Sequence, residues 1–279
     1  MRCPHCAAEP LYVAVGGVTC PGGHTFDVAR QGYVSLLTGN QRRHRGDTAA
    51  MVAARMAFLE HGHYRPLLST LTALTVEHAP ADGHLAVDLA GGTGYYLGGV
   101  LDGLPDRWGG VVTDLSTAAL RRAARAHPRA AAVGVDVWQP LPLRSRSAGV
   151  VLNVFGPRNV GEIERVLASD GILVVAGAAP DHLRELRRLA GTIGVDPRKR
   201  ERLDAVLKAF EPVDRQPVTW RLALEPAEVE KLVLMGPNAH HVDPVQLRAA
   251  LDVPWGLVVA TASIDVAVYR LRRPPGADR

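Results

Sequence analysis

From residue 84 onward, apolar runs of strand length alternate with segments of helical periodicity. Five of these runs are predicted to be strands: 85–89, 111–113, 131–135, 149–154 and 172–176. Strands that alternate with helices predict an α/β fold, in which a parallel sheet is covered by helices on both faces. Ligands in such folds bind at the carboxyl ends of the strands, so the residues that follow each run are the candidate binding residues.

The segments on either side of this pattern differ from it. Two long strand-like segments, 213–224 and 256–271, predict a terminal antiparallel hairpin at one edge of the sheet. Together with the parallel strands they give a Rossmann-like, mostly parallel sheet of seven strands. Upstream, 49–60 and 67–77 have helical periodicity, and Asp47 or Thr48 is the expected N-cap of the first helix.

Composition and charge narrow the class of protein. Of the 279 residues, 47% are hydrophobic and 22% are charged, which suffices for a folded core and excludes wholesale disorder. The chain has neither an apolar run of about 18 residues nor a signal-peptide pattern, so we expect a cytoplasmic protein with no membrane partner. The net charge of +4 is compatible with a polyanionic partner. Arg42, Arg43 and Arg45 would then contact phosphates, although such a run can also be a plain solvated surface.

All the cysteines lie at the N-terminus, in the pattern Cys3-x2-Cys6 followed by Cys20-x3-His24. Two knuckles of this spacing can hold Zn²⁺ tetrahedrally through three thiolates and one imidazole. Because this set leaves no coordination position for water, we expect a structural metal. His5 is a rival fourth ligand, but it sits inside the first knuckle. The alternative is three unrelated thiols near a flexible terminus.

A glycine-rich turn follows the first strand, in the sequence DLAGGTG. It lacks the G-x-G-x-x-G of a dinucleotide site and the lysine of a P-loop. Asp88 within the strand suits a cationic amino group, such as that of S-adenosylmethionine. Asp114 and Asp136 follow the second and third strands, where they suit ribose hydroxyls and an adenine amino group. Each acid alone could merely cap a loop, but three beside one glycine turn favour S-adenosylmethionine as cofactor.

Several longer stretches make a resemblance to a known family visible. The zinc pattern, FDVARQGYVSLL, GDTAAMVAARMAFLEHGHYRPL, DLAGGTGYY and NVFGPRN together resemble the 23S rRNA guanine-N1 methyltransferases of the RlmA and tylosin-resistance type. The resemblance implies a class I methyltransferase fold with a small zinc-binding module. It also implies methyl transfer to a guanine in a domain II hairpin of 23S rRNA, with possible macrolide-type resistance. A homodimer whose paired zinc modules help to grip RNA is implied as well.

The resemblance adds site residues to those taken from the pattern. It implies that Tyr64, Thr93, Gly94 and His182 contact the cofactor. The full set of expected cofactor-binding residues is Tyr64, Asp88, Gly91, Gly92, Thr93, Gly94, Tyr95, Asp114, Asp136 and His182. For the acceptor, the carbonyl of Asn153 is expected to accept a hydrogen bond from a base edge, and Phe155 is expected to stack on the base. His182 and Asp181 are weak candidates for a general base.

Two departures from the family pattern keep other functions open. Ala90 stands where the glycine loop of the family has glycine, and His240 stands where relatives carry tryptophan. A methyltransferase for a small aromatic metabolite, such as an indole or a cyclic dipeptide, is one alternative. An inactive RNA-binding protein is the other. In each case we expect three parts: a zinc module over 1–37, a helical linker over 38–83, and the methyltransferase domain over 84–279.

Overall fold

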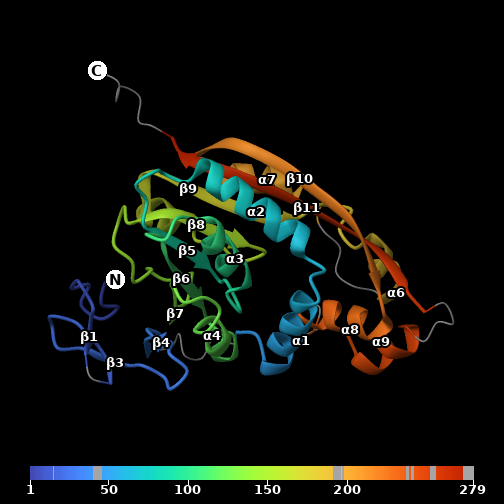
Figure 1. Ribbon diagram of the computed structural model, residues 1–279, viewed down its shortest axis with the longest axis horizontal. Helices are drawn as coiled ribbons and strands as arrows, with labels where there is room; N and C mark the ends of the chain where they lie inside the picture. The colour runs from blue at the N-terminus through green and yellow to red at the C-terminus, as the bar shows by residue number, and fades with distance from the viewer. Residues whose placement is uncertain are drawn as a thin grey trace.

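The computed structural model describes residues 1–14, 16–39, 46–190, 196, 198–236, 239, 242–251 and 256–272. Its main feature is an eight-stranded sheet with the order β10-β11-β9-β8-β5-β6-β7-β4. A second, three-stranded sheet, β1-β2-β3, forms a separate small unit at the N-terminus (Figure 1). The predicted α/β class, with a mostly parallel sheet, is confirmed.

The small sheet consists of β1 (Tyr12–Ala14), β2 (Gly17–Thr19) and β3 (Thr25–Asp27), all antiparallel. The chain then adds β4 (Val34–Ser35) to the edge of the main sheet, parallel to β7. This two-residue strand raises the count from the predicted seven to eight. It is too short to produce an alternation of apolar and polar residues, so the sequence pattern missed it.

The parallel part of the main sheet follows the predicted alternation. Its strands are β5 (Leu85–Leu89), β6 (Gly109–Asp114), β7 (Ala130–Gly134), β8 (Ala148–Val154) and β9 (Leu167–Ala178). The helices that join and precede them are α1 (Ala49–Glu60), α2 (Arg65–His78), α3 (Tyr95–Gly103), α4 (Thr117–Ala123) and α5 (Val160–Val166). Side chains cap three of these helices, because Thr48, Ser116 and Asn159 each accept a hydrogen bond from a backbone N–H three residues on.

The predicted antiparallel strands at the far edge are present, but they do not form a simple hairpin. After α6 (Arg184–Ala190) and α7 (Lys199–Val206), β10 (Phe210–Leu224) is followed by α8 (Pro226–Leu234) and α9 (Pro244–Leu251). The chain then returns as β11 (Val258–Leu271), which pairs antiparallel with both β10 and β9. Figure 1 shows α8 and α9 gathered beside α1, away from the small N-terminal sheet.

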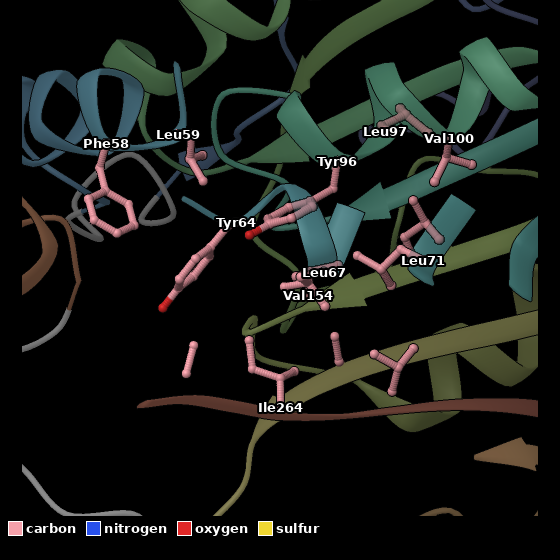
Figure 2. Packing of buried hydrophobic residues seen from close by; sticks show 14 of the residues in the cluster. Phe58, Leu59, Tyr64, Leu67, Leu71, Tyr96, Leu97, Val100, Val154 and Ile264 are labelled. Atoms are coloured by element: carbon pink, nitrogen blue, oxygen red, sulfur yellow. The ribbon is translucent and has the colours of Figure 1, made fainter. Parts of the chain in front are cut away.

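The sheet is apolar on both faces, so there are two cores. Side chains at alternate positions of β5, β8, β9 and β11 pack with α1, α2, α3 and α8 in one core. The remaining inward positions of these strands pack with α5 and residues around α7 in the other, which also holds Cys3, Cys20 and Phe26 of the small sheet. Figure 2 shows side chains from α1, α2, α3, β8 and β11 converging in the first core. In the described part of the chain, no helix combines the length and the apolar character needed to cross a membrane.

Candidate active site and zinc cluster

The four predicted zinc ligands lie together in the small N-terminal unit. The ligand atoms of Cys3, Cys6, Cys20 and His24 are all within 4.8 Å of one another. The Cys20 Sγ atom lies 3.7 Å from that of Cys6 and 3.5 Å from Nδ1 of His24. Burial alone would raise the pKa of Cys20, but hydrogen bonding with His24 lowers that pKa to about 6. Three sulfurs and one imidazole nitrogen at these separations fit tetrahedral Zn²⁺.

Neighbouring residues support this cluster without joining it. A Cβ on Gly22 would lie 3.1 Å from the Cys6 sulfur, so glycine leaves room for the ligands. The ring of His5 stacks on that of His24, with centroids 5.0 Å apart, and His5 is outside the ligand group. The unit is tied to the main domain by a hydrogen bond of 3.0 Å from the backbone N–H of Arg2 to the carbonyl of Pro142.

The glycine loop between β5 and α3 is built from left-handed residues. Ala90, Gly92 and Gly94 have φ values of 54°, 58° and 80°. The added Cβ of Ala90, the departure from the family pattern, is accommodated in the loop, and it lies 3.3 Å from where a Cβ on Gly156 would be. The loop is fastened to β6 by a hydrogen bond of 2.9 Å from the Gly91 N–H to the carbonyl of Thr113.

Asp88 lies behind this loop, where neither of its side-chain oxygens has a hydrogen-bond partner among the described residues. The side chain is fully buried, and a Cβ on Gly91 would lie 2.4 Å from Oδ2. Burial, with a smaller contribution from Asp114, raises the pKa of Asp88 to about 8. Gly91 of the loop therefore lies directly against this buried carboxyl group.

Asp114 and Asp136 occupy different positions at the carboxyl edge. Asp114 ends β6 and accepts hydrogen bonds of 2.9 Å from the N–H of Gly92 and 2.7 Å from that of Ser116. Its pKa is raised by burial, which outweighs the lowering by these two bonds. Asp136 lies two residues beyond β7, rather than directly at the strand end as predicted, and accepts from the N–H of Trp138 at 3.0 Å.

A cavity of about 450 Å³ opens beside Asp114. Its lining residues come from the segment around β4, the turn before α1 and the start of α4: Ser35, Leu37, Gly46, Asp47, Leu115, Ser116, Thr117 and Ala118. Of the other predicted cofactor residues, Thr93 is buried and Tyr95 half-buried at the start of α3. The cavity adjoins Asp114 in the sequence through its lining residues Leu115 and Ser116, and Asp114 in turn accepts the hydrogen bond from Gly92 of the glycine loop.

The turn after β8 brings the predicted acceptor residues to the same edge. Phe155 has φ 56°, a strained backbone conformation for an aromatic residue, and its side chain is 43% exposed. Asn153 is fully buried and holds the turn together. Its amide donates to the Pro157 carbonyl at 2.9 Å, and its carbonyl accepts from Arg158 Nε at 2.6 Å. The base-edge contact predicted for Asn153 would therefore require this turn to open.

Tyr64 and His182 meet Phe155 from other elements. The ring centroid of Phe155 lies 6.4 Å from each of the other two rings. The Tyr64 hydroxyl is 3.4 Å from His182 Nε2, and His182 Nδ1 accepts a hydrogen bond of 3.2 Å from the N–H of Ser263. Trp220 packs against Tyr64 with ring centroids 5.4 Å apart. The three predicted residues thus form one aromatic cluster, of which Phe155 is the exposed member.

Two residues that the sequence did not single out also lie at this edge. Trp138 is 62% exposed, and its carbonyl accepts a hydrogen bond from Asn159 in the turn after β8. Arg55 of α1 lies against the glycine loop, with Nη1 3.1 Å from where a Cβ on Gly92 would be. Helical periodicity places Arg55 on α1 but carries no signal for this contact. The predicted phosphate contacts, Arg42, Arg43 and Arg45, and the substituted His240 lie outside the described residues.

Comparisons with known proteins support the zinc-binding unit and the fold. Residues 1–45 match the family model of the RlmA N-terminal zinc ribbon. Over 97% of this chain, it is 44% identical to a protein of Micromonospora griseorubida described as a 23S rRNA (guanine-N1)-methyltransferase, covering 97% of that protein. It is 43% identical to the 23S rRNA (guanine(748)-N1)-methyltransferase of Streptomyces fradiae, with 97% of this chain and 96% of that protein covered. A solved structure from Bacillus halodurans, described as a methyltransferase, aligns with 73% of this chain and 97% of its own at a TM-score of 0.50 and 15% identity.

Proposed function

The chain belongs to the family of 23S rRNA guanine-N1 methyltransferases, and from this premise we propose that it methylates N1 of a guanine in 23S rRNA. The observation that carries the proposal is the proximity of the glycine loop to the turn that bears Phe155. The Cβ atom of Ala90 lies 3.3 Å from the Cβ position of Gly156. A donor in the loop and a base on Phe155 would therefore be neighbours, which methyl transfer between them requires.

We propose that S-adenosylmethionine binds across the glycine loop and Asp114. Each Asp114 oxygen already accepts one backbone hydrogen bond, and a carboxylate oxygen has a second lone pair for a ribose hydroxyl. The left-handed loop residues Gly92 and Gly94 let the backbone approach a ligand closely. Asp136 is proposed for the adenine amino group, and Tyr64, Thr93, Tyr95 and His182 for the remainder of the cofactor.

The methyl donor supplies an electrophilic methyl group when it is bound. The chain would contribute chiefly by orientation, since holding the acceptor nitrogen about 3 Å from the methyl carbon can lower the barrier by several kcal/mol. Guanine N1 must also lose a proton. Because His182 Nδ1 accepts from the Ser263 N–H, its Nε2 carries the proton in this tautomer and donates toward Tyr64. That arrangement disfavours His182 as the base, and direct loss of the proton to water is our preferred route.

A guanine in RNA must leave its stack to reach this edge. We propose that Phe155 stacks on the extruded base and that Trp138 stacks on a neighbouring one. Both aromatic rings are exposed beside the same turn. The zinc ribbon would hold the RNA backbone with Arg42, Arg43 and Arg45, and we propose a homodimer, in the cytoplasm, with two such ribbons. By analogy with the name of the Streptomyces fradiae relative, guanine 748 is the first nucleotide to test.

Primer extension on 23S rRNA tests the function directly. N1 methylation blocks Watson–Crick pairing, so the treated RNA should stop reverse transcriptase next to the modified guanine. Omitting S-adenosylmethionine, or using an Asp114→Ala variant, should abolish the stop. Transfer to a small indole or cyclic dipeptide without a stop on RNA would contradict the RNA assignment. A chain that binds RNA but gives no heat with S-adenosylmethionine would be an inactive RNA-binding protein instead.

A further inference from the structure

The positively charged side chain of Arg55, on α1, packs against the glycine loop. Neither the sequence pattern nor the family resemblance assigned it a role. Its Nη1 atom lies 3.1 Å from where a Cβ on Gly92 would be, so the guanidinium is in contact with the loop. The side chain is 24% exposed, which leaves one side open to a ligand. Glycine at position 92 is what allows this approach.

The other end of the guanidinium is held firmly. Nη2 forms an ion pair with Asp47 Oδ2 at 2.6 Å and donates a hydrogen bond to the Met235 carbonyl at 2.5 Å. Asp47 is itself anchored, because its carbonyl accepts a hydrogen bond of 2.6 Å from Ser116 Oγ. Across the described residues, Arg55 makes these two polar contacts, both through Nη2, so both N–H groups of Nη1 remain available on the loop side. The side chain is therefore oriented before any ligand arrives.

The chemistry of the loop indicates what Nη1 would bind. S-adenosylmethionine carries a single carboxylate, on its amino-acid part, and that part is expected beside the glycine loop if its ribose reaches Asp114. The carboxyl groups of Asp47 and Asp114 lie at this place, so a further carboxylate needs a fixed cation to be tolerated there. A guanidinium with two free, directed N–H groups matches a carboxylate.

We propose that Arg55 binds the α-carboxylate of the methyl donor through Nη1. Asp47 and the Met235 carbonyl would orient the guanidinium through their contacts with Nη2. This assignment rests on the proposed function and names a specificity residue within the same site. It distinguishes the donor from nucleosides that lack the amino-acid part.

The test compares two ligands that differ in this part. S-adenosylhomocysteine retains the carboxylate, whereas 5′-methylthioadenosine keeps the nucleoside and the sulfur but lacks the amino-acid part altogether. Binding of both to wild type and Arg55→Ala is measured by calorimetry on zinc-loaded protein. A lost charge-assisted hydrogen bond predicts that Arg55→Ala binds S-adenosylhomocysteine about 10- to 100-fold more weakly, while 5′-methylthioadenosine changes by less than about threefold.

Three further variants keep the outcome decisive. Arg55→Lys preserves the charge and the helix but lacks the paired N–H groups of the guanidinium. It should therefore lose affinity for S-adenosylhomocysteine selectively, but less than Arg55→Ala does. It replaces Arg55→Ala in the test if that variant does not fold. Arg122→Ala removes an exposed arginine in the last turn of α4 and should change neither affinity. Asp47→Asn should weaken S-adenosylhomocysteine less than Arg55→Ala does.

Equal losses for the two ligands, or none, would overturn the assignment while leaving the proposed function intact. Wild-type protein that binds neither ligand would overturn the proposed function, and this assignment with it.

Discussion

Asp88→Asn isolates the energetic cost of a buried carboxyl group that has no hydrogen-bond partner among the described residues. Because burial raises the pKa of Asp88 from 3.8 to about 8, the folded chain holds the proton over a pH range in which the unfolded chain has lost it. A group whose pKa is raised on folding contributes stability at low pH, and that contribution is lost as the pH rises toward the folded pKa. Stability of the cofactor-free protein should therefore fall between about pH 4 and pH 8 on account of this residue.

The magnitude follows from the two pKa values. Each pH unit above the unfolded pKa costs about 1.4 kcal/mol, so at pH 7 the cost is about 4 kcal/mol. Asparagine has nearly the same shape but does not titrate. Its buried amide carries a penalty of its own, of about 1–3 kcal/mol, which does not change with pH. The signature is thus the slope of the difference in stability between variant and wild type, not its absolute value.

Urea unfolding of zinc-loaded protein between about pH 5 and pH 7.5 measures this slope. The free energy of unfolding of Asp88→Asn minus that of wild type should increase by about 3 kcal/mol over this range. All other titrating groups are common to both chains, so their effects cancel. Asp82→Asn, at an exposed aspartate before β5, should give a flat difference. A flat difference for Asp88→Asn as well would refute the reasoning, because Asp88 would then be ionised and stabilised in the fold.

Four further variants have separate readouts. Cys20→Ser removes one of the four zinc ligands, so it should lose stoichiometric zinc in metal analysis and melt at a lower temperature in calorimetry. An unchanged zinc content and melting temperature would refute the structural role. Gly91→Ala should lower the free energy of unfolding by more than about 2 kcal/mol, since its Cβ would lie 2.4 Å from Asp88 Oδ2; an unchanged urea midpoint would contradict the loop geometry. Phe155→Leu removes an aromatic face on which the base would stack, so it should reduce kcat/KM for RNA about 10- to 100-fold without weakening the binding of S-adenosylhomocysteine. An equal loss of affinity for S-adenosylhomocysteine would argue against stacking of the acceptor base. Trp138→Ala should weaken RNA binding by about 1–3 kcal/mol in a filter-binding assay, and an unchanged affinity would remove it from the RNA path.

The parts of the fold that depend on local spacing could be predicted from the sequence. The zinc cluster follows from two knuckles of fixed length, and the parallel sheet follows from apolar runs that alternate with helices. The sequence singled out Tyr64, Phe155 and His182 individually, but it did not predict that their rings form one cluster. Their meeting depends on α2, β8 and the segment after β9 lying against one another, which no local pattern encodes.

The roles of individual polar side chains were harder to predict, because they depend on which way each side chain points. Asp88 is predicted to suit a cationic amino group, and its full burial against Gly91 is a feature that the sequence does not reveal. Asn153 was expected to accept from a base, yet its hydrogen bonds close the turn that presents Phe155. Arg55 looked like one polar position on an amphipathic helix, and its contact with Gly92 spans 37 residues of sequence.

Departures from ordinary backbone geometry concentrate at the carboxyl edge of the sheet. Of five non-glycine residues with positive φ in the described chain, Ala90, Phe155 and Leu183 flank the proposed donor and acceptor positions. Each costs about 1–2 kcal/mol, and two of them are fixed by backbone hydrogen bonds, from Phe155 to Ala176 at 3.0 Å and from Leu183 to Thr261 at 2.7 Å. Both acceptors lie on the long strands β9 and β11, whose buried positions are occupied by hydrophobic residues. The extended edge of the sheet, β9 to β11, thus stabilises strain that the active site imposes, so changes in β11 far from the ligands should alter how Phe155 and His182 are presented.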